Sequence, residues 1–122
     1  MKKKADLKVW DIESEILITL ASHVRPGITT LTLNHLAKDL IEQYDVASFN
    51  RGYYPTWAPE PYPYETCIAV NNEIVHGIPS ERVLKEGDLV NIDLGIIKDN
   101  QCADAALTVG VGKISEEDQL LW

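Results

Sequence analysis

Cysteine, clustered positive charge and long apolar runs are all scarce in this sequence, and each scarcity excludes a class of protein. Cys67 and Cys102 are its two cysteines, and with no signal-peptide pattern we expect reduced thiols rather than a disulfide framework. The only basic cluster is Lys2-Lys3-Lys4, and the formal net charge is −8, which argues against nucleic acid and anionic membranes as partners. No apolar run reaches the length of a membrane span. We therefore expect a cytoplasmic protein.

The length of the chain limits the number of domains that it can form. A chain of 122 residues can form one small domain with a modest core, but not two domains. Its content of 45% hydrophobic and 25% charged residues is ordinary for a globular protein. Without an internal repeat or a domain boundary, residues 1–122 are expected to form a single domain.

Two stretches near the N-terminus have the periodicity of amphipathic helices. Residues 11–24 repeat apolar side chains at spacings of three and four, and Arg25-Pro26-Gly27 ends the pattern. A second helix is expected from an N-cap at Thr32 to Tyr44. Its apolar face consists of Leu33, Leu36, Ala37, Leu40, Ile41 and Tyr44.

The segment from residue 47 to residue 65 has a different composition. Pro59, Pro61 and Pro63 exclude a helix or a central strand there. Tyr and Trp side chains surround these prolines, so the loop either packs over a sheet or offers aromatic surface to a ligand. A strand is expected directly after it, at residues 67–70, and a short one at residues 73–76.

Two aspartates, Asp93 and Asp104, each lie in apolar, strand-like sequence, separated by the turn-forming cluster Lys98-Asp99-Asn100. A two-residue turn at 98–99 places the aspartates directly opposite each other. A turn at 99–100 makes them diagonal neighbours on the same face, whereas a three-residue loop without a bulge separates them. The first two geometries bring the carboxylates within about 4.5–8 Å.

Two carboxylates this close in apolar surroundings repel each other and are poorly solvated. Either one takes up a proton or a cation lies between them. Hard divalent cations prefer oxygen ligands, so a metal-binding pair is one interpretation. The alternative is structural, with one Asp facing solvent at a strand end and the other forming a turn or cap.

The sequence around these aspartates resembles the methionine aminopeptidases of bacterial type. The resemblance is carried by V-N-N-E-I-V-H-G-I-P at residues 70–79, by K-E-G-D at 85–88, by N-I-D at 91–93, and by a second Asp eleven positions on, followed by T-V-G-V-G. Upstream, R-P-G-I-T-T-L-T-L at 25–33 is similar to the start of a family helix. The resemblance extends from about residue 12 to residue 122.

That resemblance implies an α+β, pita-bread (creatinase/aminopeptidase) fold, of which this chain would be the N-terminal half: two helices packed on an antiparallel sheet. It also implies two divalent metal ions (Mn, Fe, Co or Zn) that activate a water for attack on a peptide bond. Asp93 matches a ligand of one metal and Asp104 the carboxylate that bridges both. His76 matches a histidine near the scissile bond. Cys67 and Tyr62 match residues that line the pocket for the methionine side chain.

The sequence departs from the family pattern in two places. The family's remaining metal ligands, one His and two Glu, lie downstream of the positions that this chain covers. Cys102 stands where the family often has His. Two carboxylates alone bind a divalent ion weakly, so we expect poor activity from the chain by itself, and self-association or pairing with a missing C-terminal half.

Three functions are therefore carried forward. The first is removal of the initiator methionine from nascent proteins and peptides that begin with Met. The second is a truncated, catalytically inactive binding or scaffold protein. The third is another exopeptidase of the same fold, of the Xaa-Pro type.

Overall fold

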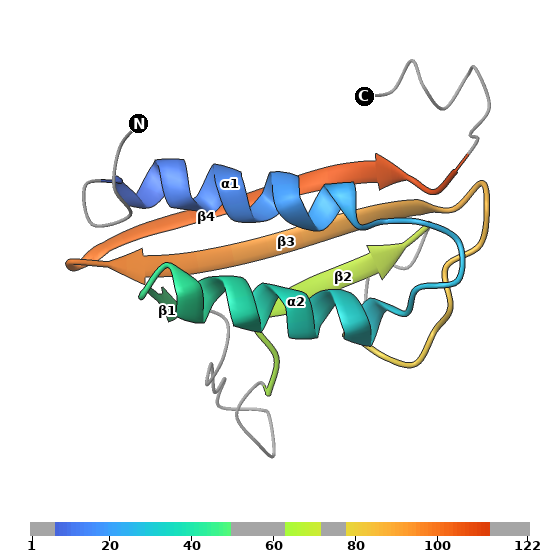
Figure 1. Ribbon diagram of the computed structural model, residues 1–122, viewed down its shortest axis with the longest axis horizontal. Coiled ribbons are helices and arrows are strands. Elements are labelled where there is room, and N and C mark those ends of the chain that lie inside the picture. Colours follow the sequence, from blue (N-terminus) through green and yellow to red (C-terminus); the bar gives the residue numbers. More distant parts are fainter. Residues whose placement is uncertain (1–6, 50–62, 72–77, 113–122) are drawn as a thin grey trace.

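Both predicted helices are present; the first begins two residues and the second three residues earlier than expected. The computed structural model describes residues 7–49, 63–71 and 78–112, with α1 at Val9–Ser22 and α2 at Thr30–Gln43 (Figure 1). The predicted N-cap at Thr32 is wrong. Thr29 has the extended backbone of a cap, and its Oγ1 accepts a hydrogen bond from the backbone N–H of Thr32 at 3.1 Å. Because a threonine at either position can cap a helix, spacing alone did not distinguish them.

Four antiparallel strands form one sheet around a long central strand. They are β1 at Ala47–Ser48, β2 at Thr66–Val70, β3 at Leu89–Lys98 and β4 at Gln101–Gly110. β4 pairs with β3 along its whole length, so β1 and β2 share the other edge of β3 (Figure 1). The strand predicted at residues 67–70 is confirmed as β2. The strand predicted at residues 73–76 lies outside the described residues.

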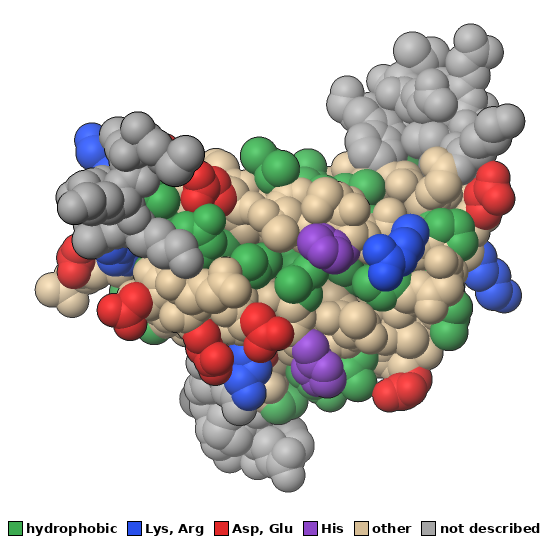
Figure 2. Space-filling view, viewed as in Figure 1, with side chains coloured by type: hydrophobic (Ala, Val, Ile, Leu, Met, Phe, Trp, Pro, Cys, Tyr) green, Lys and Arg blue, Asp and Glu red, His purple; other side chains and the backbone are tan. Residues whose placement is uncertain are grey.

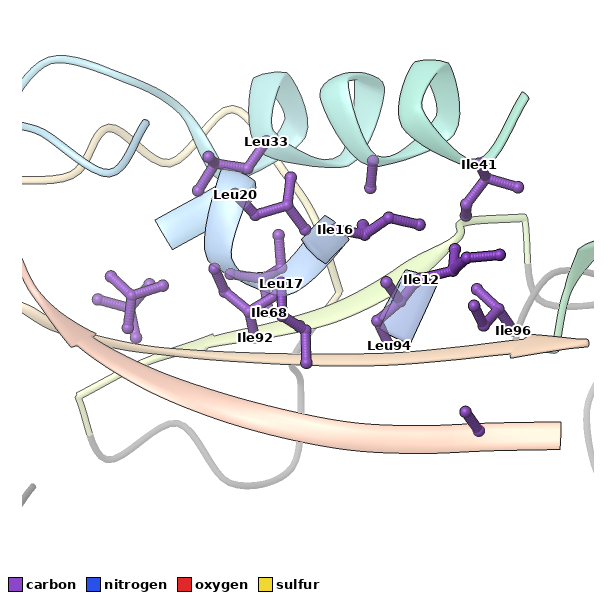
Figure 3. Packing of buried hydrophobic residues seen from close by; sticks show 14 of the residues in the cluster. Ile12, Ile16, Leu17, Leu20, Leu33, Ile41, Ile68, Ile92, Leu94 and Ile96 are labelled. Carbon is purple, nitrogen blue, oxygen red and sulfur yellow. The ribbon is translucent and has the colours of Figure 1, made fainter. Parts of the chain in front are cut away.

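Both helices pack on the same face of the sheet, and the core lies between the two layers (Figure 3). α1 covers β3 and β4, while α2 lies over β1 and β2. Ile92, Leu94 and Ile96 of β3 alternate toward the helices and are completely buried. They meet the buried apolar faces of the helices, formed by Val9, Ile12, Ile16, Leu17, Leu20, Leu33, Ala37 and Ile41.

The alternation of β3 has a direct consequence for its polar residues. Side chains between the buried positions, including Asp93, must project from the opposite face of the sheet. This face has no helix against it within the described residues. The sheet therefore has a helix-covered face and an open face, and the candidate site lies on the open one.

The helix-covered surface has mixed character. Figure 2 shows acidic side chains spread over this face, with Lys and Arg side chains scattered between them and green apolar side chains along the middle. Trp10 and Ile18 on α1 are among the exposed apolar residues. Within the described residues, no helix is both long enough and apolar enough to cross a membrane.

Candidate active site

The turn between β3 and β4 places the two aspartates on the same face of the sheet. Asp99 and Asn100 form it, with φ values of 51° and 67°. Left-handed conformations at both central residues match the twist of the flanking strands. In this register Asp93 lies opposite Ala106, and Asp104 lies opposite Gly95. The aspartates are thus diagonal neighbours on the open face, as expected for a turn at 99–100.

The two carboxyl groups interact directly. Asp93 is half-buried and Asp104 is exposed. Burial, a hydrogen bond with the Asp104 side chain and the negative charge of that group together raise the pKa of Asp93 from 3.8 to about 6. A negative charge this close to Asp93 favours either a proton on that carboxyl group or a cation beside it.

A third carboxyl group, on α1, was missed by sequence reasoning. Glu13 is only 2% exposed, and neither of its side-chain oxygens has a hydrogen-bond partner. Burial raises the pKa of Glu13 from 4.5 to about 8, and the charges of Asp104 and Asp93 add to the rise, although the Ala105 backbone offsets part of it. The Glu13 carboxyl group lies on the helix-covered side of β4, whereas the aspartate pair lies on the opposite face of the sheet.

The sequence contained a signal for this burial. Glu13 precedes Ile16 by three residues and Leu17 by four, so it lies on the apolar stripe of the predicted helix. A charged residue at such a position either extends to solvent or is buried. The structure shows that it is buried.

Phe49 is a second residue that sequence reasoning missed. Its backbone N–H donates to the carbonyl oxygen of Gly95 at 2.8 Å, and its side chain is 50% exposed. A Cβ atom on Gly95 would lie 2.9 Å from the Cβ of Phe49 and 3.3 Å from a carbon of its ring, so the Phe49 side chain, from its Cβ outward, occupies the space that a side chain at position 95 would need. Because Gly95 lies opposite Asp104, an apolar ring stands on the open face beside the carboxyl pair.

Of the predicted substrate-binding residues, Cys67 is the one the structure describes. It lies on β2 directly opposite Asp93, is half-buried and is not part of a disulfide. Cys102 is exposed and lies two residues before Asp104 in β4, on the same face. The predictions for His76 and Tyr62 fall outside the described residues.

The residues present fit part of a metal site. Carboxylate oxygens are the ligands that hard divalent cations prefer, and Asp93 and Asp104 are diagonal neighbours on one face of the sheet. Within residues 7–49, 63–71 and 78–112, no group of three His, Cys, Asp or Glu side chains could hold a metal ion. The pair is therefore an incomplete ligand set.

Comparison with known proteins gives the context of this pair. Residues 7–122 match metallopeptidase family M24. The chain belongs to this family. Among curated relatives, the methionine aminopeptidase of Aquifex aeolicus is 41% identical over 115 residues, which cover 93% of this chain and 45% of the relative. That of Clostridium perfringens is 40% identical over 114 residues, covering 93% and 43%. The chain thus spans less than half the length of these relatives.

Comparison with solved structures agrees on the fold. The methionine aminopeptidase of Thermotoga maritima superposes with a TM-score of 0.82 at 31% identity, covering 93% of this chain and 43% of that one. The X-Pro aminopeptidase of Thermotoga maritima superposes with a TM-score of 0.68 at 21% identity, covering 90% and 28%, and shows the fold alone. The predicted family and the predicted pita-bread fold, α+β with two helices on an antiparallel sheet, are both confirmed. Membership of M24 also makes this chain part of a peptidase family.

Proposed function

We propose that this chain forms the N-terminal half of a methionine aminopeptidase, which removes the initiator methionine from nascent proteins in the cytosol. The observation that carries the proposal is the placement of Asp93 and Asp104 as diagonal neighbours on the open face of one hairpin. It is supported by relatives that are named methionine aminopeptidase and are 40–41% identical over nearly the whole chain.

In this proposal the two carboxylates have different roles. Asp93, on β3, would hold one divalent ion, and Asp104, on β4, would be a ligand shared by both ions. When bound, the ions would supply the Lewis acidity that lowers the pKa of a water to near neutrality. Metal and proton would compete for these carboxyl groups, in keeping with the raised pKa of Asp93.

The other proposed roles concern the peptide. His76 hydrogen-bonds the substrate near the scissile bond. Cys67, which stands opposite Asp93, and Tyr62 contact the methionine side chain, and the exposed ring of Phe49 contributes apolar surface on the same face as Cys67. Soft and aromatic side chains suit a thioether.

Completion of the ligand set requires further groups. We propose that they come from a C-terminal half, as the length of the relatives suggests, or from a second copy of this chain. Among the described strands, β4 has no neighbour along its outer edge. Such an edge offers unpaired backbone groups to an incoming strand, and Asp104 lies on that strand.

Two alternatives remain for experiment. An Xaa-Pro exopeptidase shares the fold, but its solved examples superpose less well, with TM-scores of 0.67–0.69 against 0.80–0.82 for three methionine aminopeptidases. An inactive binding protein is favoured by the incomplete ligand set among the described residues. Hydrolysis of Met-Ala-Ser, Ala-Ala-Ser and Xaa-Pro peptides with added Mn²⁺ distinguishes the three.

The experiment that tests the site itself is calorimetric titration of the chain with Mn²⁺ at pH 7.5. We expect Asp93→Asn and Asp104→Asn each to weaken binding by roughly tenfold or more. Asp99→Asn is the matched control, because it removes a carboxylate from the same hairpin at an exposed turn position where Asn is also comfortable. Equal Mn²⁺ affinity in all three variants would remove the aspartate pair from the proposal.

A further inference from the structure

A buried amide on α2 holds the beginning of strand β2. Asn34 is 2% exposed. Its Oδ1 accepts three hydrogen bonds: from the backbone N–H of Glu65 at 3.1 Å, from the backbone N–H of Thr66 at 3.0 Å and from the Thr66 hydroxyl at 2.7 Å. Its Nδ2 donates to Oε1 of Glu65 at 3.1 Å. One side chain therefore makes four hydrogen bonds with two consecutive residues.

All three members of this network are removed from water. Glu65 is 3% exposed and Thr66 is fully buried. Loss of the Asn34 amide would leave buried donors without this acceptor, and buried unpaired donors are strongly disfavoured. The network therefore specifies one position of this backbone relative to α2, whereas apolar packing alone would tolerate small shifts.

The fixed residues directly precede the candidate site. Thr66 lies opposite Leu94, and the next residue, Cys67, lies opposite Asp93. β2 has only five residues, Thr66–Val70, and β3 is its one partner strand among the described residues. At the far end of β2, Oδ1 of Asn71 accepts a hydrogen bond from the backbone N–H of Leu89 at 2.9 Å. Asn34 thus anchors the end of the strand from which Cys67 projects.

We propose that Asn34 is a positioning residue of the candidate site: its network with Glu65 and Thr66 holds Cys67 opposite Asp93 and so sets the shape of the substrate-side wall. This inference rests on the proposed function, since it assigns Cys67 to the methionine pocket. Asn34 acts through β2 and does not itself contact substrate or metal.

The test follows the Cys67 thiol in a Cys102→Ser background, so that one reactive cysteine remains. The rate of alkylation by iodoacetamide is measured with and without L-methionine as a protecting ligand. We expect Asn34→Ala to raise the alkylation rate about tenfold through local opening of β2, and to reduce protection by L-methionine. Mn²⁺ affinity is measured on the same samples and should change less than twofold, because both aspartates stay on the β3–β4 hairpin.

Thr30→Val is the matched control for a loss of stability alone. Thr30 is also buried on α2 and exchanges two hydrogen bonds with the Ser80 backbone, at 3.1 and 2.8 Å, away from Cys67. Its alkylation rate should rise less than twofold. The double variant Asn34→Asp/Glu65→Gln, which reverses donor and acceptor in the side-chain pair, should bring the rate back to within about twofold of the parent.

The outcomes separate the two proposals. Equal alkylation rates in Asn34→Ala and Thr30→Val at equal stability would overturn the positioning role. If Asn34→Ala does not fold, Asn34→Asp replaces it, since it keeps the three accepted bonds and changes only the donated one; an unchanged rate and unchanged protection in that variant count against the inference. Absence of Mn²⁺ binding in the parent chain would count against the proposed function instead, because the thiol measurement does not depend on metal.

Discussion

Replacing Glu13 should stabilise the chain, and by an amount that depends on pH. Its carboxyl group is buried between α1 and β4 without a hydrogen-bond partner, and its pKa rises from 4.5 to about 8. The folded chain thus keeps a proton that the unfolded chain releases above pH 4.5. Stability is therefore unaffected by this group at lower pH, falls as the pH rises from 4.5 to about 8, and stays low above that.

The magnitude follows from the size of the shift. Each pKa unit corresponds to about 1.4 kcal/mol, so the full penalty above pH 8 is about 5 kcal/mol. At pH 7 about half to three quarters of it, roughly 3 kcal/mol, is present, and at pH 5 less than about 1 kcal/mol. For a small domain with a total stability of about 5–15 kcal/mol, this is a large fraction.

Urea denaturation followed by circular dichroism at pH 5, 7 and 9 measures the effect. Glu13→Gln keeps the shape and removes the titration, so its stability should exceed that of the parent by about 3 kcal/mol at pH 7 and approach it at pH 5. Asp39→Asn, at an exposed position on α2, is the control and should leave the pH dependence unchanged. The reasoning is refuted if parent and Glu13→Gln lose stability in parallel between pH 5 and pH 9.

Two further predictions concern the open face. Gly95→Ala should destabilise the fold by about 1–3 kcal/mol, because the new Cβ would lie 2.9 Å from the Cβ of Phe49. Alanine at position 49 keeps that Cβ atom. Adding Phe49→Ala should therefore restore little of the lost stability, as measured by thermal melting. Recovery of stability in the Gly95→Ala/Phe49→Ala double variant would instead show that the steric conflict is with the Phe49 ring. Asp104→Asn should lower the pKa of Asp93 from about 6, while burial keeps it above 3.8; carboxyl ¹³C NMR measures this, and an unchanged pKa would show that the two groups do not interact.

The helices, β2 and the β3–β4 hairpin were predictable because the pattern of neighbouring residues indicates each of them. Helical periodicity, the turn cluster and the alternation around Asp93 identified both helices, β2, and the hairpin, and the two aspartates were expected on one face for either two-residue turn. The choice between Asp99-Asn100 and Lys98-Asp99 depended on which residues adopt positive φ, and the structure selects the pair containing Asn, a residue that tolerates it.

What escaped prediction depends on contacts between distant segments. β1 has only two residues and is defined by its pairing with Ile96 and Ile97, so it has no periodicity of its own. Phe49 is identified by its approach to Gly95, a residue far along the chain. In the sequence, Asn34 looks like an ordinary polar residue in a helix. Its role becomes visible only from its hydrogen bonds with Glu65 and Thr66 in the folded chain. Pairing partners of this kind follow from the tertiary fold and not from spacing.

The length of the Asp99-Asn100 turn decides whether Asp93 and Asp104 lie on the same face of the sheet. Side chains alternate along β4, so one residue inserted or deleted in the turn would direct Asp104 toward α1 and Glu13, while the amino-acid composition stayed almost the same. Two residues added would restore the shared face. The length of this turn is therefore constrained more tightly than its composition: only a change by an even number of residues keeps Asp93 and Asp104 on one face.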